Sequence, residues 1–336
     1  MKFVGRVGSA AMVMAILAGC RTMPPKKPVP PTPASVAPAP ALVPTPIDPS
    51  LRAAARTELI QESNGMDVFL RCNAIEAISD QLPDDAPGPI FQALQDQAAP
   101  VRFAGAMAAG KLKLESAHNV LLAMAPDSDI RVQAAVRYAL HRMGDTRYSH
   151  DLEKFSVNLD PRIRGTTAQV LGLLGEPSAI PILMRLRADS RPEVRIQASE
   201  ALWELGDHQG MTDLLGDSIS GYPDDQIIAL LALAKPKVSD PSVIGTERGA
   251  LTSDFPEVSL AAARAMGMLG SDEGWNVAVP YVTSNDPLRR SLAAMALGAI
   301  GRPDLQPYLL VLLKDSEPAV RISAATAILQ VHEPGQ

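Results

Sequence analysis

The sequence is poor in the residues and motifs that usually carry catalysis. It holds two cysteines and five histidines, and the histidines form no H-x-x-x-H or H-E-x-x-H pair of the kind that binds zinc. No Cys-x-x-Cys, Gly-rich phosphate loop or G-x-S-x-G nucleophile elbow is present. We therefore expect a protein that is not an enzyme, with no metal site and no cofactor.

An excess of positive charge is also missing. The formal net charge is −6, and residues 50–336 alone hold 26 basic and 36 acidic residues, a formal charge of −10. Proteins that bind nucleic acid need a basic face to meet the phosphates. We therefore expect no nucleic-acid partner, whereas basic protein partners are compatible with this charge.

Aromatic residues make up 4% of the chain, although 46% of it is apolar. The chain consists instead of a repeated segment: DPRIRGTTAQVLGLLG (160–175) returns as DPLRRSLAAMALGAIG (286–301). Successive copies are 31 residues apart, except for one step of 33. Such a period predicts a solenoid of about nine repeats, whose thin core needs few bulky side chains. Aligning the copies on one position, the anchor, gives Arg71, Arg102, Gln133, Arg164, Arg195, Gln226, Ser259, Arg290 and Arg321.

Each copy has the pattern of a helix. Small or apolar residues recur at helical spacing around the anchor, and glycine follows eleven residues after it in five copies, where a helix end needs a cap. Proline precedes the anchor by three residues in six consecutive copies, a position that suits the first turn of a helix. A second, looser apolar segment fills the rest of each repeat, so we expect an all-α superhelix of helical pairs. The six prolines are Pro161, Pro192, Pro223, Pro256, Pro287 and Pro318.

These segments resemble the HEAT-repeat superfamily, in the short form named after the phycobilisome lyases. Its hallmark, D-x-x-V-R-x-x-A-A-x-A-L-G-x-L-G, is matched best by residues 160–175, 191–206 and 286–301. The resemblance covers roughly residues 51–331 and implies a helical-repeat fold. It leaves function open, because such repeats serve in lyases, scaffolds and adaptors.

The N-terminus has the features of an export signal. Basic residues precede an apolar run at 10–17 that is too short to cross a membrane, and Leu17-Ala18-Gly19-Cys20 resembles a bacterial lipobox. That resemblance implies cleavage after residue 19 and lipidation of Cys20, which would anchor the chain stably. The alternative is an ordinary cleavable signal with a chance cysteine. Because Arg21 rather than aspartate follows Cys20, we expect the periplasmic leaflet of the outer membrane, with the inner membrane as the alternative.

A proline-rich stretch links this signal to the repeats. Residues 23–49 hold eleven of the thirty prolines, a composition that favours an extended, coreless tether. A ligand for proline-binding domains is the alternative. The predicted organisation is thus a signal peptide at 1–19, a lipidated cysteine and tether at 20–49, and a solenoid at 50–336.

Six anchor arginines form a repeated column, accompanied by loop and cap carboxylates such as Asp160 and Asp286. We interpret this ladder as pairing between repeats and capping of helices, because structural columns recur in every repeat whereas binding sites usually do not. A ligand-binding row is the alternative. The arginines are Arg71, Arg102, Arg164, Arg195, Arg290 and Arg321.

Three successive copies replace the residue expected to cap the helix, with Arg191, Tyr222 and Phe255. Aromatic and arginine side chains anchor protein interfaces, so these three are the candidate partner-binding residues. The alternative is decay of the repeat, with the aromatic rings packed over the next helix. The step of 33 falls nearby, and we expect residues 235–254 to form an irregular connection with at most a short helix.

The two ends of the array and the single internal thiol complete the interpretation. We expect residues 51–62 to pair with 67–82 as the first repeat, and the last helix to cap the core itself. Cys72 is expected to be a small buried residue, although a reactive thiol beside Arg71 is possible.

The sequence thus favours a lipid-anchored scaffold or adaptor that binds other proteins in the bacterial cell envelope. The alternatives are a lyase-type enzyme or enzyme accessory, and a purely structural spacer.

Overall fold

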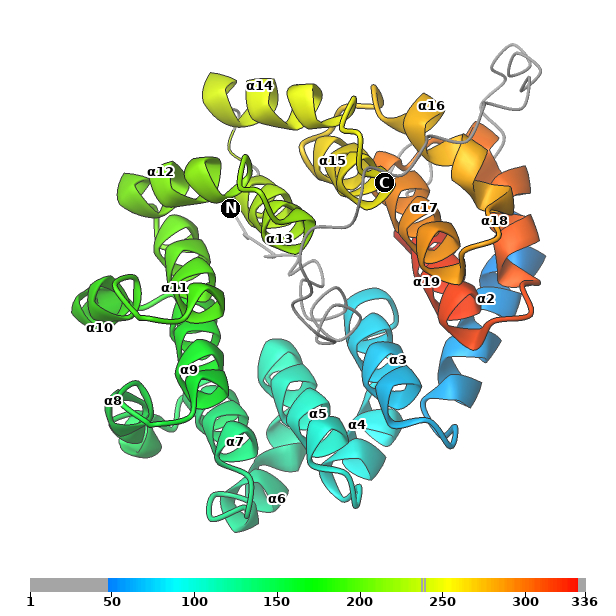
Figure 1. Ribbon diagram of the computed structural model, residues 1–336. Helices are drawn as coiled ribbons and strands as arrows, with labels where there is room; N and C mark the ends of the chain where they lie inside the picture. The colour runs from blue at the N-terminus through cyan, green and yellow to red at the C-terminus, as the bar shows by residue number, and fades with distance from the viewer. Residues whose placement is uncertain (1–47, 237, 239, 332–336) are drawn as a thin grey trace. The chain divides into compact units, whose positions relative to one another are not determined.

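A computed structural model describes residues 48–236, 238 and 240–331 (Figure 1). This part of the chain consists of eighteen α-helices and five short 3-10 turns and contains no strand, so the all-α solenoid class is confirmed. The predicted signal peptide, Cys20 and nearly all of the tether lie outside the described residues.

Nine helices contain or directly follow the predicted start of each copy, and each carries an anchor residue. We call them B helices: α3 (Val68–Gln81), α5 (Ala99–Leu112), α7 (Ile130–Arg142), α9 (Pro161–Leu174), α11 (Pro192–Glu204), α13 (Pro223–Ala234), α15 (Pro256–Met268), α17 (Pro287–Ile300) and α19 (Pro318–Gln330).

The helix that precedes each B helix in the chain is its A helix, and most A helices are shorter. They are α2 (Pro49–Glu62), α4 (Pro87–Leu94), α6 (His118–Ala123), α8 (Asp151–Phe155), α10 (Ile180–Leu186), α12 (His208–Asp217), α14 (Pro241–Ala250), α16 (Trp275–Ala278) and α18 (Gln306–Leu313). The 3-10 turns are η1 (Glu115–Ala117), η2 (Thr146–Tyr148), η3 (Pro177–Ala179), η4 (Val279–Thr283) and η5 (Pro303–Leu305).

The ends of the B helices follow from local chemistry. The five predicted capping glycines adopt positive φ, as the left-handed turn at a helix end requires. In one of the copies without such a glycine, Lys113 takes the left-handed conformation itself, with φ of 50°. At the helix starts, the side chains of Asp160 and Asp286 accept hydrogen bonds from the backbone N–H groups of Arg162 and Leu288.

Neighbouring B helices approach closely at a column of glycines eight residues after the anchor. A Cβ at Gly172 would lie 2.7 Å from Cβ of Ala201, and one at Gly298 would lie 2.5 Å from Cβ of Ala327. Both contacts are too short for a carbon atom, so these positions require glycine. The facing residues on the next B helix, Ala201 and Ala327, are small as well, so the two helices lie close together. This close packing sets the distance between successive repeats.

The described chain forms two compact units. The first unit comprises residues 63–217, from α3 to α12. The second unit comprises residues 48–62 and 218–331, that is, α13 to α19 together with α2. The chain therefore leaves one unit for the other directly after an A helix, once after α2 and once after α12.

The expectation of an irregular connection with at most a short helix at 235–254 is wrong. Helix α14 spans ten residues there. Asp240 caps its start by accepting from the N–H groups of Ser242 and Val243, and Pro241 occupies the first helical position. These start signals outweigh the poor helix-forming residues that follow.

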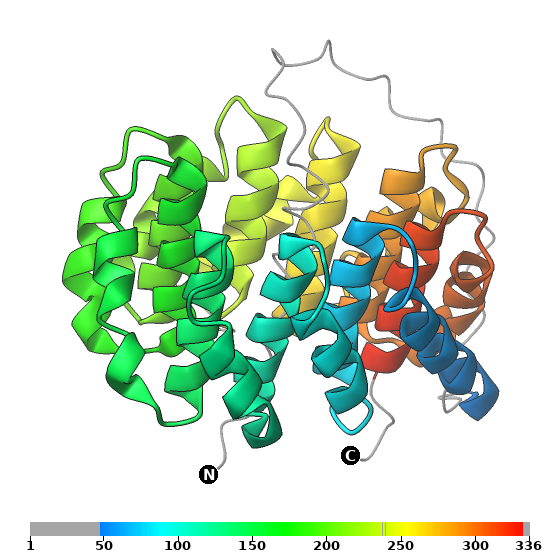
Figure 2. The same cartoon turned by 90° about the horizontal axis from the view of Figure 1, so that it is seen from below.

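The expected pairing of the first two helices is also wrong. Helix α2 packs against α19, at the opposite end of the described chain, and so belongs to the second unit, whereas α3 belongs to the first. Figures 1 and 2 both show the blue α2 beside the red α19. Leu51, Ala55 and Leu59 form its buried stripe, at the spacing of one helix face. The last described helix is therefore covered by the first described helix, and the expectation that it caps the core itself is wrong as well.

Candidate interaction surface

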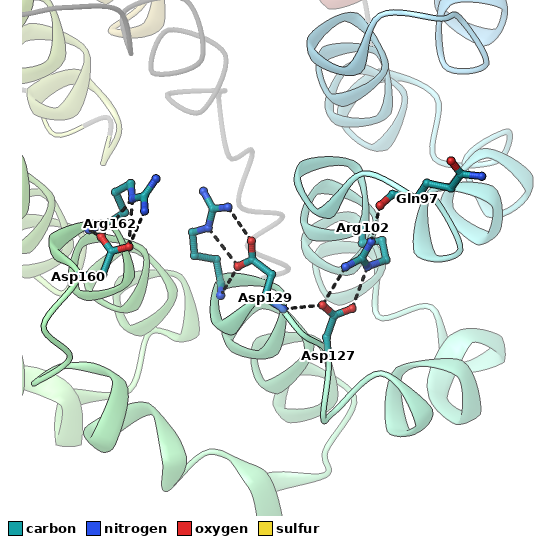
Figure 3. A network of polar contacts seen from close by, with 7 residues as sticks. Gln97, Arg102, Asp127, Asp129, Asp160 and Arg162 are labelled. Carbon is teal, nitrogen blue, oxygen red and sulfur yellow. Dashed lines mark hydrogen bonds and ion pairs between the residues drawn. The ribbon is translucent and has the colours of Figure 1, made fainter.

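The anchor arginines connect consecutive repeats. The Nε and Nη2 atoms of Arg102 donate to the two carboxylate oxygens of Asp127, at 2.8 and 2.9 Å (Figure 3). Its Nη1 atom donates to the backbone carbonyls of Asp96 and Gln97, both at 3.0 Å. The guanidinium thus holds the loop before its own helix and a carboxylate 25 residues further along the chain. The same two-pronged ion pair joins Arg71 to Asp96, Arg164 to Asp189 and Arg290 to Asp315.

These ion pairs are largely shielded from water and perturb the carboxylates. The side chains of Arg164 and Asp189 are 14% and 10% exposed. Hydrogen bonds from the guanidinium lower the pKa of Asp127, Asp189 and Asp315 below the ordinary aspartate value. These three carboxylates are therefore ionised at neutral pH and bound within the chain.

The two members of the pair change together along the chain. Gln133 replaces the arginine where Asn158 replaces the aspartate 25 residues later, and Ser259 is likewise matched by Ser284. Arg195 is the exception, because residue 220 is a serine. Among the described residues, Arg195 donates only to the backbone carbonyls of Asp189 and Ser190, at 3.1 and 3.3 Å.

The helix-start aspartates hold a second set of arginines. Arg162 binds Asp160 through Nε and Nη2, and Arg131 binds Asp129 in the same way on the preceding repeat (Figure 3). Arg162 lowers the pKa of Asp160 by hydrogen bonding. These charges are thus matched by near neighbours.

The three candidate partner-binding residues occupy the expected helix-start positions. Arg191 is exposed and binds Glu193, two residues away, at 2.9 Å. Tyr222 and Phe255 stand directly before α13 and α15, which pack together in the second unit. Tyr222 is exposed, whereas Phe255 is only partly exposed.

Further exposed apolar residues lie at the same edge of the repeats. Within each unit they stand in, or directly after, the connection between an A helix and its B helix. Their exposure runs from 54% to 100%, against a fully buried alanine core. They form three pairs: Met66 with Phe69 and Val157 with Leu159 in the first unit, and Ile219 with Tyr222 in the second unit.

A model of HEAT repeats matches residues 48–141, 151–228 and 276–336. The chain belongs to the HEAT-repeat family. The comparison with curated proteins gave no match.

Two solved structures are among those similar to this chain. Human deoxyhypusine hydroxylase is 19% identical over 76% of this chain and 98% of its own, with a TM-score of 0.38. The complex of CpcE and CpcF of phycocyanin lyase from Nostoc sp. PCC7120 is 19% identical over 77% of this chain and 100% of the matched chain, with a TM-score of 0.43. At this identity the likeness concerns the fold alone.

Comparison of equivalent HEAT-repeat positions would have revealed most of the exposed apolar residues. Five residues before the anchor, other copies carry Gln97, Ser128 or Ser190, all exposed, where Met66 and Leu159 stand. The sequence reasoning compared only the capping position, and it therefore found Tyr222 and missed the others. Pairing between repeats was expected, but the sequence reasoning named carboxylates at the helix starts and did not name those at 96, 127, 189 and 315.

Two further titratable groups have raised pKa values, the partly buried Cys72 beside Arg71 and the buried Glu247. Burial raises the pKa of the Cys72 thiol to about 12, so the thiol is protonated and a poor nucleophile at neutral pH. Glu247 of α14 is fully buried, and no described residue donates a hydrogen bond to either of its carboxylate oxygens. Burial raises its pKa well above the ordinary value. No described helix is both long and apolar enough to cross a membrane.

Proposed function

We propose that this HEAT-repeat protein is a scaffold without chemistry of its own, which binds other proteins through the edge where its B helices begin. The three exposed apolar pairs carry the proposal. Leu159 is 97% exposed and Met66 is fully exposed, at a position where other copies have polar residues. Retaining such side chains in water is unfavourable unless a partner covers them.

The charged groups support the same proposal. The ladder arginines other than Arg195 and the helix-start aspartates Asp129 and Asp160 are matched by opposite charges within the chain, so they hold the repeats together and leave specificity to the apolar pairs. Tyr222 adds an aromatic ring with a polar end, a common anchor in interfaces. Phe255 and Arg191 would lie at the rim, since one is partly buried and the other is already bound to Glu193.

The cell envelope is the proposed location, and it rests on the sequence. Cys20 within the lipobox-like segment and the proline-rich stretch at 23–49 support a lipid anchor and a tether. At about 3.1 Å per residue, the tether would span roughly 80 Å when fully extended. Mass spectrometry of the mature N-terminus tests this: a diacylglyceryl group on Cys20 is expected, and an unmodified Cys20 would contradict it.

Site-specific photo-crosslinking in intact cells tests the binding edge. A photoreactive residue at Leu159 or Tyr222 should give a discrete adduct with one protein. The matched control is Ser190, which is exposed at the position equivalent to Leu159 in the next repeat. Equal labelling from Ser190 and Leu159, or no adduct from any apolar pair, would contradict the proposal and favour a spacer role.

A further inference from the structure

Helix α2 gives the last described repeat the carboxylate contacts that a following repeat gives to most earlier ones. Arg321 is the last anchor residue, and no aspartate 25 residues further on exists for it in the described chain. Its Nε atom donates instead to Glu58 Oε1 at 2.6 Å, and its Nη2 atom to Glu62 Oε1 at 3.1 Å. Its Nη1 atom binds the carbonyls of Asp315 and Ser316, as in the other copies.

The remaining contacts of α2 lie on the same C-terminal repeat. The Nη2 atom of Arg52 donates to the carbonyl of Val331 at 2.5 Å, and the backbone N–H of Asp48 donates to Gln306 Oε1 at 3.2 Å. Leu51 and Leu59 are 7% and 0% exposed, although the next helix in the sequence, α3, lies in the other unit. An apolar stripe, an ion pair and two further bonds thus hold α2 on a surface more than 250 residues away in sequence.

Helix α2 packs in the second unit, but along the chain it is not joined directly to the rest of that unit. Residues 63–67 join α2 to the first unit, whereas every bond described above joins it to the second. A second copy of the chain carries an identical α2, which fits the same surface with the same residues. We propose that α2 is exchangeable, so that α2 of one copy completes the second unit of another in a reciprocal dimer.

The match between the residues of α2 and this surface identifies α2 of a second copy as the proposed occupant. The stripe of Leu51, Ala55 and Leu59 and the glutamates at 58 and 62 occur together on α2. The intramolecular contact benefits from a high effective concentration, so exchange depends on protein concentration and on opening of the linker. Gly65 in the linker allows the backbone to change direction there.

A pair of charge-reversal variants tests the exchange. One copy carries Arg321→Glu, and the other carries Glu58→Arg and Glu62→Arg. Alone, each variant faces like charges at the contact and is expected to be open and monomeric. Mixed in equal amounts, they should form a 1:1 dimer, because both contacts between copies are then complementary. Light scattering after size-exclusion chromatography measures the doubling of mass, and native mass spectrometry identifies both copies.

Two controls separate exchange from other association. All three substitutions in one chain restore the contact internally and should give a monomer. Arg164→Glu mixed with Asp189→Arg should also remain monomeric, because that pair joins consecutive repeats of one continuous array. A mixture of the first pair that stays monomeric while both variants keep their helical circular dichroism would overturn the proposal.

A second measurement covers variants that fail to fold. In a background of Cys20→Ser and Cys72→Ser, one copy carries Asp48→Cys and the other carries Gln306→Cys. Both positions are at least partly exposed, and their native residues are in contact. After joint unfolding and refolding, a short bis-maleimide should link the two copies. Absence of the linked species, while both cysteines placed in one chain react internally, would likewise overturn the proposal.

Discussion

Arg321 in the last described helix binds Glu58, which precedes it by 263 residues, at 2.6 Å. The second unit is therefore built from both ends of the repeat array. Arg321 receives from α2 the kind of carboxylate contact that every earlier ladder arginine except Arg195 receives from the following repeat.

Arg321→Ala should loosen this closing contact. Loss of a half-buried, charged hydrogen-bonded pair costs about 2 kcal/mol. Hydrogen exchange should become faster in α2 and α19, with little change in α5 to α9. Faster exchange throughout both units would show that the contact stabilises more than the second unit.

The ladder offers a matched pair of arginines. Arg164→Ala removes an arginine bound to Asp189 and leaves a largely buried carboxylate without its partner, so it should lower the free energy of unfolding by about 2–3 kcal/mol. Arg195→Ala loses only bonds to backbone carbonyls and should cost about 1 kcal/mol. Urea unfolding measures both, and equal losses would contradict a stabilising role for the carboxylate pair.

The same ion pairs predict sensitivity to acid. The pKa of Asp189 is lowered in the folded chain by its bonds to Arg164. Its contribution is therefore complete above the unfolded pKa of about 3.9, and is lost as the pH falls through the lower folded pKa. In Asp189→Asn, the decline of melting temperature below that pH should be shallower than in the wild type. A parallel decline would assign the acid sensitivity to other groups.

Glu247 predicts the opposite dependence of stability on pH. Its raised pKa means that, above an unfolded pKa of about 4.3, the folded chain must retain a proton or bury a charge. The wild type should therefore gain stability as the pH falls from 7 towards 4.5. Glu247→Gln should have the higher melting temperature at pH 7, and the difference should vanish near pH 4. Glu273→Gln is the control, since that exposed residue binds Arg248 and should give no such gain.

Replacing glycine by alanine should have opposite effects inside the glycine column and outside it. Gly298→Ala places a carbon against the backbone and side chain of Ala327 and should cost about 1–3 kcal/mol. Gly216 lies in α12 with open space around it, so Gly216→Ala should stabilise by up to about 1 kcal/mol through the better helix former. A neutral Gly298→Ala would mean that successive repeats can separate without loss.

The period in the sequence was sufficient to predict the B helices and their ends. Proline and glycine at fixed distances from the anchor mark where a helix can start and stop, and these constraints are local. Helix α14 was missed because the interpretation gave more weight to the irregular spacing than to the start signal at Asp240 and Pro241.

The closing contact could not be read from the period, because a repeat pattern gives the order of helices but not which non-consecutive helices meet. Glu58 and Glu62 do not stand at the aspartate position of the other copies, so no column identifies them. The candidate surface was predicted only in part for a related reason. Exposure of Leu159 becomes informative only beside its polar counterpart Ser190, and the partner itself leaves no trace in the spacing.

The placement of α2 on α19 also fixes an order of events during synthesis. Helix α2 is made before α19, and the 263 residues between Glu58 and Arg321 take on the order of 10–50 s at roughly 5–20 residues per second. The apolar stripe of α2 is therefore exposed to solvent until α19 has been translated. A chain that terminates before α19 never covers it, so this contact distinguishes chains that contain α19 from chains truncated before it.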